Sequence, residues 1–394
     1  MKQVRQTHFD SIRGIAALIV VFNHFLAAFF PYAIFGVQSQ YIQRSSWEDI
    51  FFYPPFGGLV AGQFAVCLFF ILSGYVLSYG FLGGQGHARK IIANIFKRPI
   101  RLGGLVLFTV LISSLFWWGG WFLNNEVSVH STSIPWYSRY WKGAFEFKEL
   151  LINLSTSLFY HGAKYNPPLW TIRVELYGSI LVYLFVFFFG NFRFRLFFLF
   201  IALIFLFDSL FLGFVFGVII ADLVKNHPFF IKVLSNKKLL IALIPLLLFF
   251  VSFPFSVSGD FLKETVYGLL PVDQIAGGYL YPLIGALLLF LLILGSTKIQ
   301  SILNHKYLKF LGEISYALYV IHFLVLGTFS SGLFLFLYSY MPYDLAFIIT
   351  FLISIPLIVL LSYLATKYVD GPTIKLSSYI GTKIRGGDNY KKGG

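Results

Sequence analysis

The residues from Phe9 to Phe25, FDSIRGIAALIVVFNHF, place ionisable side chains in an apolar run that is long enough to enter a membrane. Asp10 and Arg13 stand near its start, and His24 stands near its end. On an α-helix, residues eleven positions apart lie almost in register, so Arg13 and His24 share a face, separated by about 16 Å along the axis. Asp10 precedes Arg13 by three residues and can pair with it. Because hydrocarbon is a poor solvent for such groups, the stripe is a candidate functional site, with His24 as a candidate base.

The same stripe has a structural alternative. An Asp–Arg pair suits the start of a helix, and a buried histidine can bond a neighbouring helix without doing chemistry. The shared face and the depth of His24 keep both interpretations open. Asn23 lies about 100° from His24 around the helix, so we expect it to hydrogen-bond another helix and assign it no chemical role.

The stretch ARKIIANIFKRPIRL, residues 88–102, gathers basic residues at the edge of another apolar run. Arg98 and Arg101 are three residues apart and are neighbours on a helix. A guanidinium group matches two phosphate oxygens at once, so this pair is suited to a diphosphate. The alternative is an amphipathic helix at the membrane surface that contacts anionic lipid.

The stretch PPLWTIRVELYGS, residues 167–179, carries an acidic residue into a third apolar run. Glu175 lies about two turns inside, and Arg173 is two residues away and cannot face the same side. We therefore expect Glu175 to find a His or Arg on another helix. The resulting pair is either part of a catalytic group or a structural ion pair.

Two further apolar runs carry polar residues at helical spacing. In ISYALYVIHFLVL, residues 314–326, Ser315, Tyr319 and His322 fall on one face. This face offers a second intramembrane histidine, or alternatively a polar stripe that packs the bundle. In FFILSG, Ser73 stands beside a glycine, and small residues of this kind more often mean close helix packing.

Composition places these motifs in a membrane. Of the 394 residues, 58% are hydrophobic and only 12% are charged, whereas soluble domains have about 25% charged residues. Apolar runs recur without the alternation of a barrel, so we predict an all-α polytopic bundle of about ten transmembrane helices. The fifth and sixth are short and alternatively form one bent hairpin that turns at Asp208. The predicted spans cover residues 12–32, 59–82, 103–123, 172–189, 196–207, 209–224, 239–256, 279–294, 311–330 and 343–366.

The distribution of Lys and Arg orients this bundle. With the N-terminus in the cytoplasm, the cytoplasmic segments hold 23 of these residues and the opposite side holds six. Positive charge concentrates in cytoplasmic loops, so we predict that both termini are cytoplasmic. We expect one transmembrane domain over residues 1–370 and a short cytoplasmic tail, residues 371–394, that is disordered at its end.

Several chemistries lack the residues they need. The histidines show no HExxH pattern and Cys67 is the single cysteine, so we predict neither a metal site nor an intrachain disulfide. No P-loop, GxGxxG or GxSxG motif occurs. The net charge of +14 is explained first by the basic cytoplasmic loops of a membrane protein, and no nucleic-acid motif accompanies it.

Five elements of the sequence together resemble the membrane-bound acyltransferase-3 family of O-acyltransferases, and the resemblance covers nearly the whole chain. They occur in order as FDSIRGIAALIVVFNH, FFILSG, RPIR, PLWTIRVE and SYALYVIH. The resemblance implies transfer of an acyl group, most often acetyl, from coenzyme A to a hydroxyl. It also implies that the acceptors are sugars of lipopolysaccharide, capsule, exopolysaccharide or other surface glycans.

The resemblance further implies roles for individual residues. His24 matches the family's essential histidine, Glu175 matches its carboxylate, and its basic positions correspond to Arg13, Arg98 and Arg101. Two departures stand out. Arg173 occupies a position where small or apolar residues are common, and no hydrolase-like domain follows, so we expect transfer to finish within the membrane part.

We therefore expect a multi-pass O-acetyltransferase of the bacterial inner membrane. Its donor would be acetyl-CoA, used as a substrate, with no permanently bound cofactor. His24 would act as general base and Glu175 would orient a catalytic group or hold the acceptor. Arg13, Arg98 and Arg101 would bind the phosphates of the coenzyme A donor. The supporting or substrate-contacting residues would be Asp10, Ser73, Trp170, Tyr319 and His322.

The expected partners are acetyl-CoA, membrane lipids and a surface glycan or its lipid-linked precursor, such as lipopolysaccharide O-antigen, with no nucleic acid. Direct transfer and a covalent acyl-histidine intermediate are both open. One alternative function is a proton-coupled transporter of a glycan or small solute, in which His24, Glu175 and His322 form a relay. A second alternative is a lipid acyltransferase.

Overall fold

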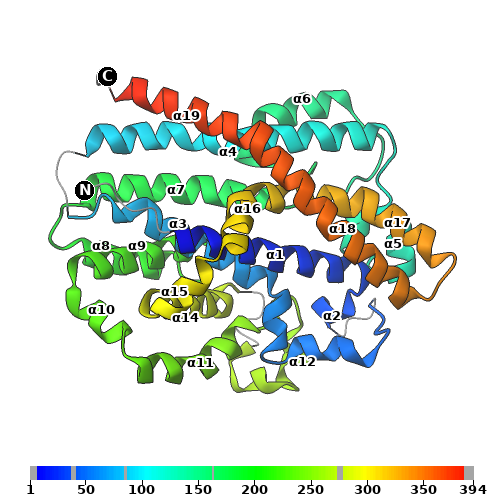
Figure 1. Cartoon of the computed structure of the whole chain (residues 1–394), viewed down its shortest axis with the longest axis horizontal. Helices are drawn as coiled ribbons and strands as arrows, with labels where there is room; N and C mark the ends of the chain where they lie inside the picture. Colours follow the sequence, from blue (N-terminus) through cyan, green and yellow to red (C-terminus); the bar gives the residue numbers. More distant parts are fainter. Residues whose placement is uncertain (1–6, 37–40, 84–86, 162–163, 273–277, 386–394) are drawn as a thin grey trace.

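The structure is a computed structural model that describes residues 7–36, 41–83, 87–161, 164–272 and 278–385. The described part is 80% helix and contains no strand, which confirms the all-α prediction. Most of the long helices run side by side along the long axis of the molecule (Figure 1). The disordered end predicted for the tail lies outside the described residues from residue 386 onward.

Six helical segments are long and apolar enough to cross a membrane, counted within the described ranges. Two of them are continuous helices that pass through a π-helical turn. In one, η6 (Leu326–Ser330) joins α16 to α17, and in the other η7 (Thr366–Asp370) joins α18 to α19. The six segments are α1 (Thr7–Phe29), α3 (Gly62–Tyr79), α4 (Ala88–Trp118), α7 (Leu169–Phe189), α16–α17 (Lys306–Tyr338) and α18–α19 (Tyr343–Ile384).

Two bent pairs raise the number of candidate spans to eight if each pair counts as one. Helices α9 (Phe211–Asn226) and α10 (Pro228–Leu234) meet at 106°, and α14 (Leu280–Gly295) meets α15 (Thr297–Leu303) at 99°. The chain is thus a multi-pass membrane protein. The predicted count of ten is not confirmed, and the predicted orientation of the termini stays a prediction.

The predicted fifth and sixth spans form the hairpin that the sequence offered as an alternative. Helix α8 (Arg195–Phe205) has 11 residues and rises about 16 Å, roughly half of a 30 Å hydrocarbon core. The connection to α9 contains Asp208, whose φ is 56°. An ion pair of 2.6 Å joins Arg195 at the start of α8 to Asp222 near the end of α9. Both ends of the hairpin therefore lie at one end of the bundle.

Two glycines allow α1 and α16 to pack closely. A Cβ on Gly14 would lie 2.6 Å from the carbonyl carbon of Leu311, and one on Gly312 would collide with the backbone of Asp10. Small residues of this kind allow helix backbones to approach in a membrane. The contact fixes the register of the two helices, which then brings His24 opposite His322.

Two long connections fold over the end of α1 rather than extending away from it. The first contains α2 (Tyr32–Phe35), η1 (Ser46–Phe52) and η2 (Phe56–Val60), and a capping box between Ser45 and Glu48 starts η1. The second contains α5 (Asn124–Ser131), η3 (Tyr137–Arg139), α6 (Phe147–Thr156) and η4 (Ser157–His161). The other described elements are α11 (Lys237–Val251), α12 (Gly259–Lys263) and η5 (Val266–Leu269).

The segment predicted as a tail begins with a helix. α19 (Gly371–Ile384, red) runs back along α4 (cyan), and the two helices pack against each other (Figure 1). The close contact is visible at Gly104, where a Cβ would collide with Thr373. Residues 371–384 are therefore part of the bundle, and the wall they form borders the site described next.

Candidate active site

Two cavities meet inside the bundle. We call the first the outer pocket: it has a volume of about 190 Å³ and is lined by the end of α1, the start of α3 and the folded connections. The second, the inner pocket, has a volume of about 470 Å³ and is lined by α1, α3, α4, α7, α16 and the η7–α19 junction. Val66 and Tyr319 line both cavities, so these two side chains form the layer between them.

The orientation of His24 follows from a chain of two hydrogen bonds. His24 Nδ1 lies 2.8 Å from His322 Nε2, and His322 Nδ1 lies 3.0 Å from the carbonyl oxygen of Leu318. A carbonyl oxygen only accepts, so His322 Nδ1 carries the proton and its neutral ring accepts at Nε2. His24 Nδ1 must then donate, which leaves the lone pair on His24 Nε2. This assignment rests on the hydrogen-bond network.

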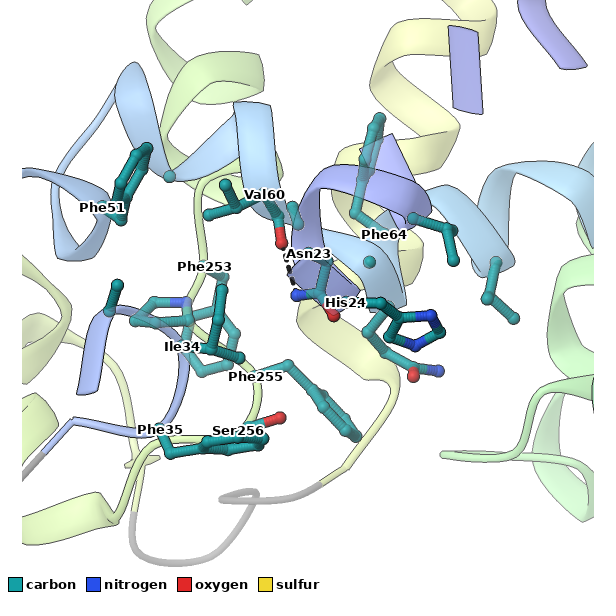
Figure 2. A pocket seen from close by; sticks show the side chains of 18 of the residues that line it. Asn23, His24, Ile34, Phe35, Phe51, Val60, Phe64, Phe253, Phe255 and Ser256 are labelled. Carbon is teal, nitrogen blue, oxygen red and sulfur yellow. Dashed lines mark hydrogen bonds between the residues drawn. The ribbon is translucent and has the colours of Figure 1, made fainter. Parts of the chain in front are cut away.

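His24 lies at the edge of an aromatic cavity. Its ring is 5.6 Å from that of Trp136 and 5.1 Å from that of Phe323, and it lines the outer pocket while His322 is fully buried behind it. Figure 2 shows His24 and Asn23 on the same turn of α1, with phenylalanines lining the cavity around them. A histidine nitrogen with a free lone pair in such a cavity can take a proton from a bound hydroxyl.

The sequence led us to expect that Asn23 hydrogen-bonds another helix, and its partner lies in the short helix η2 of the first connection. Its Nδ2 donates a hydrogen bond of 2.7 Å to the carbonyl oxygen of Val60, drawn as the dashed line in Figure 2. Val60 ends η2, so this bond ties the folded connection to α1 beside His24. Asn23 also packs on Gly62 at the start of α3, where a Cβ would lie 2.9 Å from its Cγ.

Glu175 has the arginine partner that the sequence predicted. Arg98 on α4 lies 2.5 Å from its Oε1, and Ser73 on α3 donates to the same oxygen at 2.8 Å. Both side chains of the ion pair are mostly buried, with 18% and 15% exposed. Arg173 points elsewhere and donates to the carbonyl oxygen of Tyr160. Glu175 therefore joins α3, α4 and α7 at the inner pocket.

The two arginines of the RPIR stretch do not form a single fork. Arg98 pairs with Glu175, whereas Arg101 pairs with Asp370 at the end of η7. Arg13 pairs with Asp10 at 3.4 Å, as the sequence predicted. All three arginines line the inner pocket, and each already has a carboxylate partner.

Tyr319 stands between the two pockets. Its hydroxyl is hydrogen-bonded to Thr171 Oγ1 at 2.9 Å, which ties α16 to α7. Ser315, one turn earlier on α16, lines the inner pocket. The face predicted for α16 thus runs from the inner pocket past this layer to His322.

The structure separates two residues that the sequence placed on one stripe. Arg13 lines the inner pocket and His24 lines the outer pocket, so the stripe does not face a single cavity. Trp170 lines the outer pocket. Asp10 and Ser73 line the inner pocket.

Sequence reasoning missed Asp370 and Trp136. Asp370 is the single acidic residue after Asp344 in the described chain and follows the last apolar run directly, which is the signal that marks it. Trp136 belongs to the long connection between α4 and α7, and nothing in the sequence shows that this connection folds back onto α1. No group of three His, Cys, Asp or Glu side chains is placed to hold a metal ion within the described ranges.

A family model described as an acyltransferase domain, of the acyltransferase-3 type, matches residues 7–367. The chain belongs to the acyltransferase-3 family. This membership agrees with the resemblance carried by its five motifs. Residues 368–385, including Asp370 and all of α19, lie beyond the matched segment.

One similar curated protein is an acyltransferase named R4 from Phoma sp., 24% identical over 223 residues. The match covers 44% of this chain and 47% of the relative, so the chain spans about half the length of the curated relative it matches. No solved structure matches the chain. These matches identify neither the acyl donor nor the acceptor nor the residues of the site.

Proposed function

We propose that this acyltransferase moves an acetyl group from acetyl-CoA to a hydroxyl of a cell-surface polysaccharide or its lipid-linked precursor. The observation that supports this most strongly is the lone pair on His24 Nε2 in a cavity that meets a second cavity at Tyr319. One cavity is proposed to take the acceptor and the other the donor. The predicted membrane orientation places the donor cavity on the cytoplasmic side, where coenzyme A is made.

The proposed reaction needs one base. His24 Nε2 takes the proton of the acceptor hydroxyl, and the oxygen attacks the thioester carbonyl carbon. The carbon–sulfur bond then breaks, and the sulfur leaves as coenzyme A thiol with the proton that His24 held. His322 keeps His24 in the required tautomer and accepts a hydrogen bond from the imidazolium that forms transiently.

The inner pocket is proposed to hold the donor arm and its thioester. Ser73, Arg98 and Glu175 form one hydrogen-bonded unit on its wall. N–H groups of Arg13, Arg98 and Arg101 that their carboxylate partners leave free can donate to carbonyl oxygens of the arm. The thioester has to reach the layer of Val66 and Tyr319, because His24 lines the other side of that layer.

The outer pocket is proposed to hold the acceptor sugar. Its lining combines aromatic rings with polar groups, which is the usual composition of a site that binds a small polar ring. Trp136 and Trp170 are proposed to pack on the sugar, and His24 and Asn23 to contact its hydroxyls. A lipid acceptor would instead need an apolar channel, whereas polar side chains such as Asn23, Gln63 and Ser252 stand among the aromatic rings of the outer pocket.

Mass spectrometry of envelope glycans tests the proposal. The wild-type chain and His24→Ala are expressed in a bacterial host that lacks the gene, and O-acetyl groups on lipopolysaccharide, capsule and exopolysaccharide are measured. We expect acetylation with the wild type and a loss of about 10²- to 10⁴-fold with His24→Ala. If the wild type acetylates no envelope glycan, the proposed acceptor class is wrong. If His24→Ala retains the wild-type rate, the proposed base is wrong.

A further inference from the structure

The inner pocket carries more negative than positive formal charge. Its lining includes four acidic residues, namely Asp10, Glu175, Glu313 and Asp370, against the three ion-paired arginines. A phosphate that entered this pocket would have to displace a carboxylate from an arginine and lose its own water. The pocket is therefore better suited to the uncharged arm of an acyl donor than to its phosphate groups.

Positive charge that no acidic side chain pairs among the described residues lies nearby, where α4 and α19 run side by side (Figure 1). Neither helix contains an acidic residue over its whole length. Lys97 lies across α19 at Gly381, where a Cβ would collide with its aliphatic stem. Arg385 follows one turn later and its backbone N–H donates to the Gly381 carbonyl oxygen at 3.3 Å. Lys97 lies close enough to the positive charges of Arg385 and Lys90 to be repelled by both.

We call Lys90, Lys97 and Arg385 the basic cluster. None of the three takes part in an ion pair with another described residue. Arg385 Nε is in addition buried, and it has no hydrogen-bond partner within the same part of the chain. Three neighbouring cations repel one another, and an anion with several oxygen acceptors relieves that repulsion.

The basic cluster lies on the approach to the inner pocket. Lys97 precedes Arg101 by four residues, about 6 Å along α4, and Lys90 precedes Arg101 by about 16 Å. A ligand with phosphates at the cluster can therefore extend an arm of that length into the cavity. Arg385 lies beyond residue 367, where the family match ends, whereas Lys90 and Lys97 lie within the matched segment.

We propose that the basic cluster binds the phosphate groups of an anionic ligand between α4 and α19. This inference rests on the proposed function in assigning those phosphates to the coenzyme A donor. Its arm then enters the inner pocket while the phosphates remain at the cluster. The second source of the same chemistry is the headgroup of an anionic lipid, and the two sources predict different measurements.

Binding of coenzyme A to the full chain in phosphatidylcholine nanodiscs tests the donor assignment by calorimetry. The variant is Lys97→Met with Arg385→Met, because methionine keeps the stem that packs on α19 and removes only the charge. We expect it to weaken coenzyme A binding by about tenfold or more, the loss of two charge-assisted contacts, and to leave pantetheine binding within about twofold. The charge-conserving variant Lys97→Arg with Arg385→Lys should restore most of the affinity.

The matched control is Lys237→Ala with Lys238→Ala, two exposed lysines at the start of α11, which should leave coenzyme A binding unchanged. If the wild type binds coenzyme A and the methionine variant binds it equally well, the donor assignment is overturned while the proposed function stands. If the wild type binds no coenzyme A at all, the proposed donor itself is wrong.

The lipid source is tested by melting the same two proteins in nanodiscs with phosphatidylglycerol. A stabilisation by phosphatidylglycerol that the wild type shows and the methionine variant lacks, together with unchanged coenzyme A binding, assigns the phosphates to lipid. If neither coenzyme A affinity nor this stabilisation depends on the two charges, the basic cluster binds no phosphate and the inference is refuted.

Discussion

His322 decides which nitrogen of His24 can act as the base. The carbonyl oxygen of Leu318 fixes the proton on His322 Nδ1, and the remaining lone pair of that ring accepts from His24. His322 is buried and lines neither pocket, but its hydrogen bond sets the tautomer of His24, which lines the outer pocket. His322 is therefore a positioning residue in the proposed mechanism.

Replacing His322 tests that role. His322→Ala should lower kcat by about tenfold or more, because His24 loses a hydrogen bond worth about 1–2 kcal/mol and its fixed tautomer. His322→Gln should recover part of the rate, since its side-chain oxygen can accept from His24 Nδ1–H. Steady-state kinetics with acetyl-CoA measures both, and KM for the donor should stay unchanged. If His322 had only a structural role, the activity of each variant would instead fall in proportion to its loss of thermal stability.

Removing one partner of the Arg98–Glu175 ion pair should strongly destabilise the folded protein. Both side chains are mostly buried at the inner pocket, where an unpaired charge is poorly solvated. Arg98→Met should lower the free energy of unfolding by about 3–5 kcal/mol, and so should lower the melting temperature. Adding Glu175→Gln removes the orphaned charge, so the double variant should melt above the Arg98→Met single variant. A double variant that melts lower still would show that the two side chains act independently.

The close packing of α1 on α16 is the contact that brings the two histidines together. Gly14 and Gly312 leave no room for a Cβ, because each faces the backbone of the other helix. The contact lies about three turns from His24, yet it sets the register at which the rest of the two helices pack.

Gly312→Val should therefore destabilise the protein by about 1–3 kcal/mol and abolish most of its acyl transfer. Gly103→Ala on α4 is the matched control, because its Cβ would lie 3.7 Å from Leu158 Cδ2, an ordinary contact. Melting temperature and transfer rate are measured for both in the same detergent. If the two variants have equal melting temperatures and transfer rates, close packing of α1 on α16 is not required for stability or activity.

Helical spacing accounts for what the sequence predicted well. The Asp10–Arg13 pair, the arginine partner of Glu175 and the contact of Asn23 with another element all follow from side-chain periodicity and the cost of burying polar groups. Spacing along one helix says nothing about which cavity a side chain faces. The separation of Arg13 from His24, and the pairing of Arg101 with Asp370, depend on how other helices pack around them.

Lengths of apolar runs were a weaker guide to the number of spans. Helix α8 is apolar after Arg195 yet covers only 11 residues, and α9 and α14 each bend sharply into a short helix. An apolar run shows that a segment avoids water, but its turns are set by residues such as Asp208 and by packing. The number of crossings is accordingly six to eight by length and composition, within the described residues.

The orientation of the whole bundle in the membrane can be read with single cysteines. Cys67 is buried and is the single cysteine, so Cys67→Ser provides a background without reactive thiols. Lys148→Cys on α6 should react with a membrane-impermeant maleimide in intact spheroplasts, whereas Lys238→Cys on α11 should react only after lysis, because positive charge concentrates in the cytoplasm. The reverse pattern would invert the bundle and place the donor pocket on the wrong side.

The most direct test of the account is transfer of radiolabelled acetyl from acetyl-CoA by purified protein in proteoliposomes supplied with envelope glycan. The wild type should label the glycan in an ester bond that mild base cleaves. His24→Ala should fall by about 10²- to 10⁴-fold while it still binds coenzyme A with the wild-type affinity. Labelling at the wild-type rate by His24→Ala would contradict the claim that His24 is the base at the outer pocket.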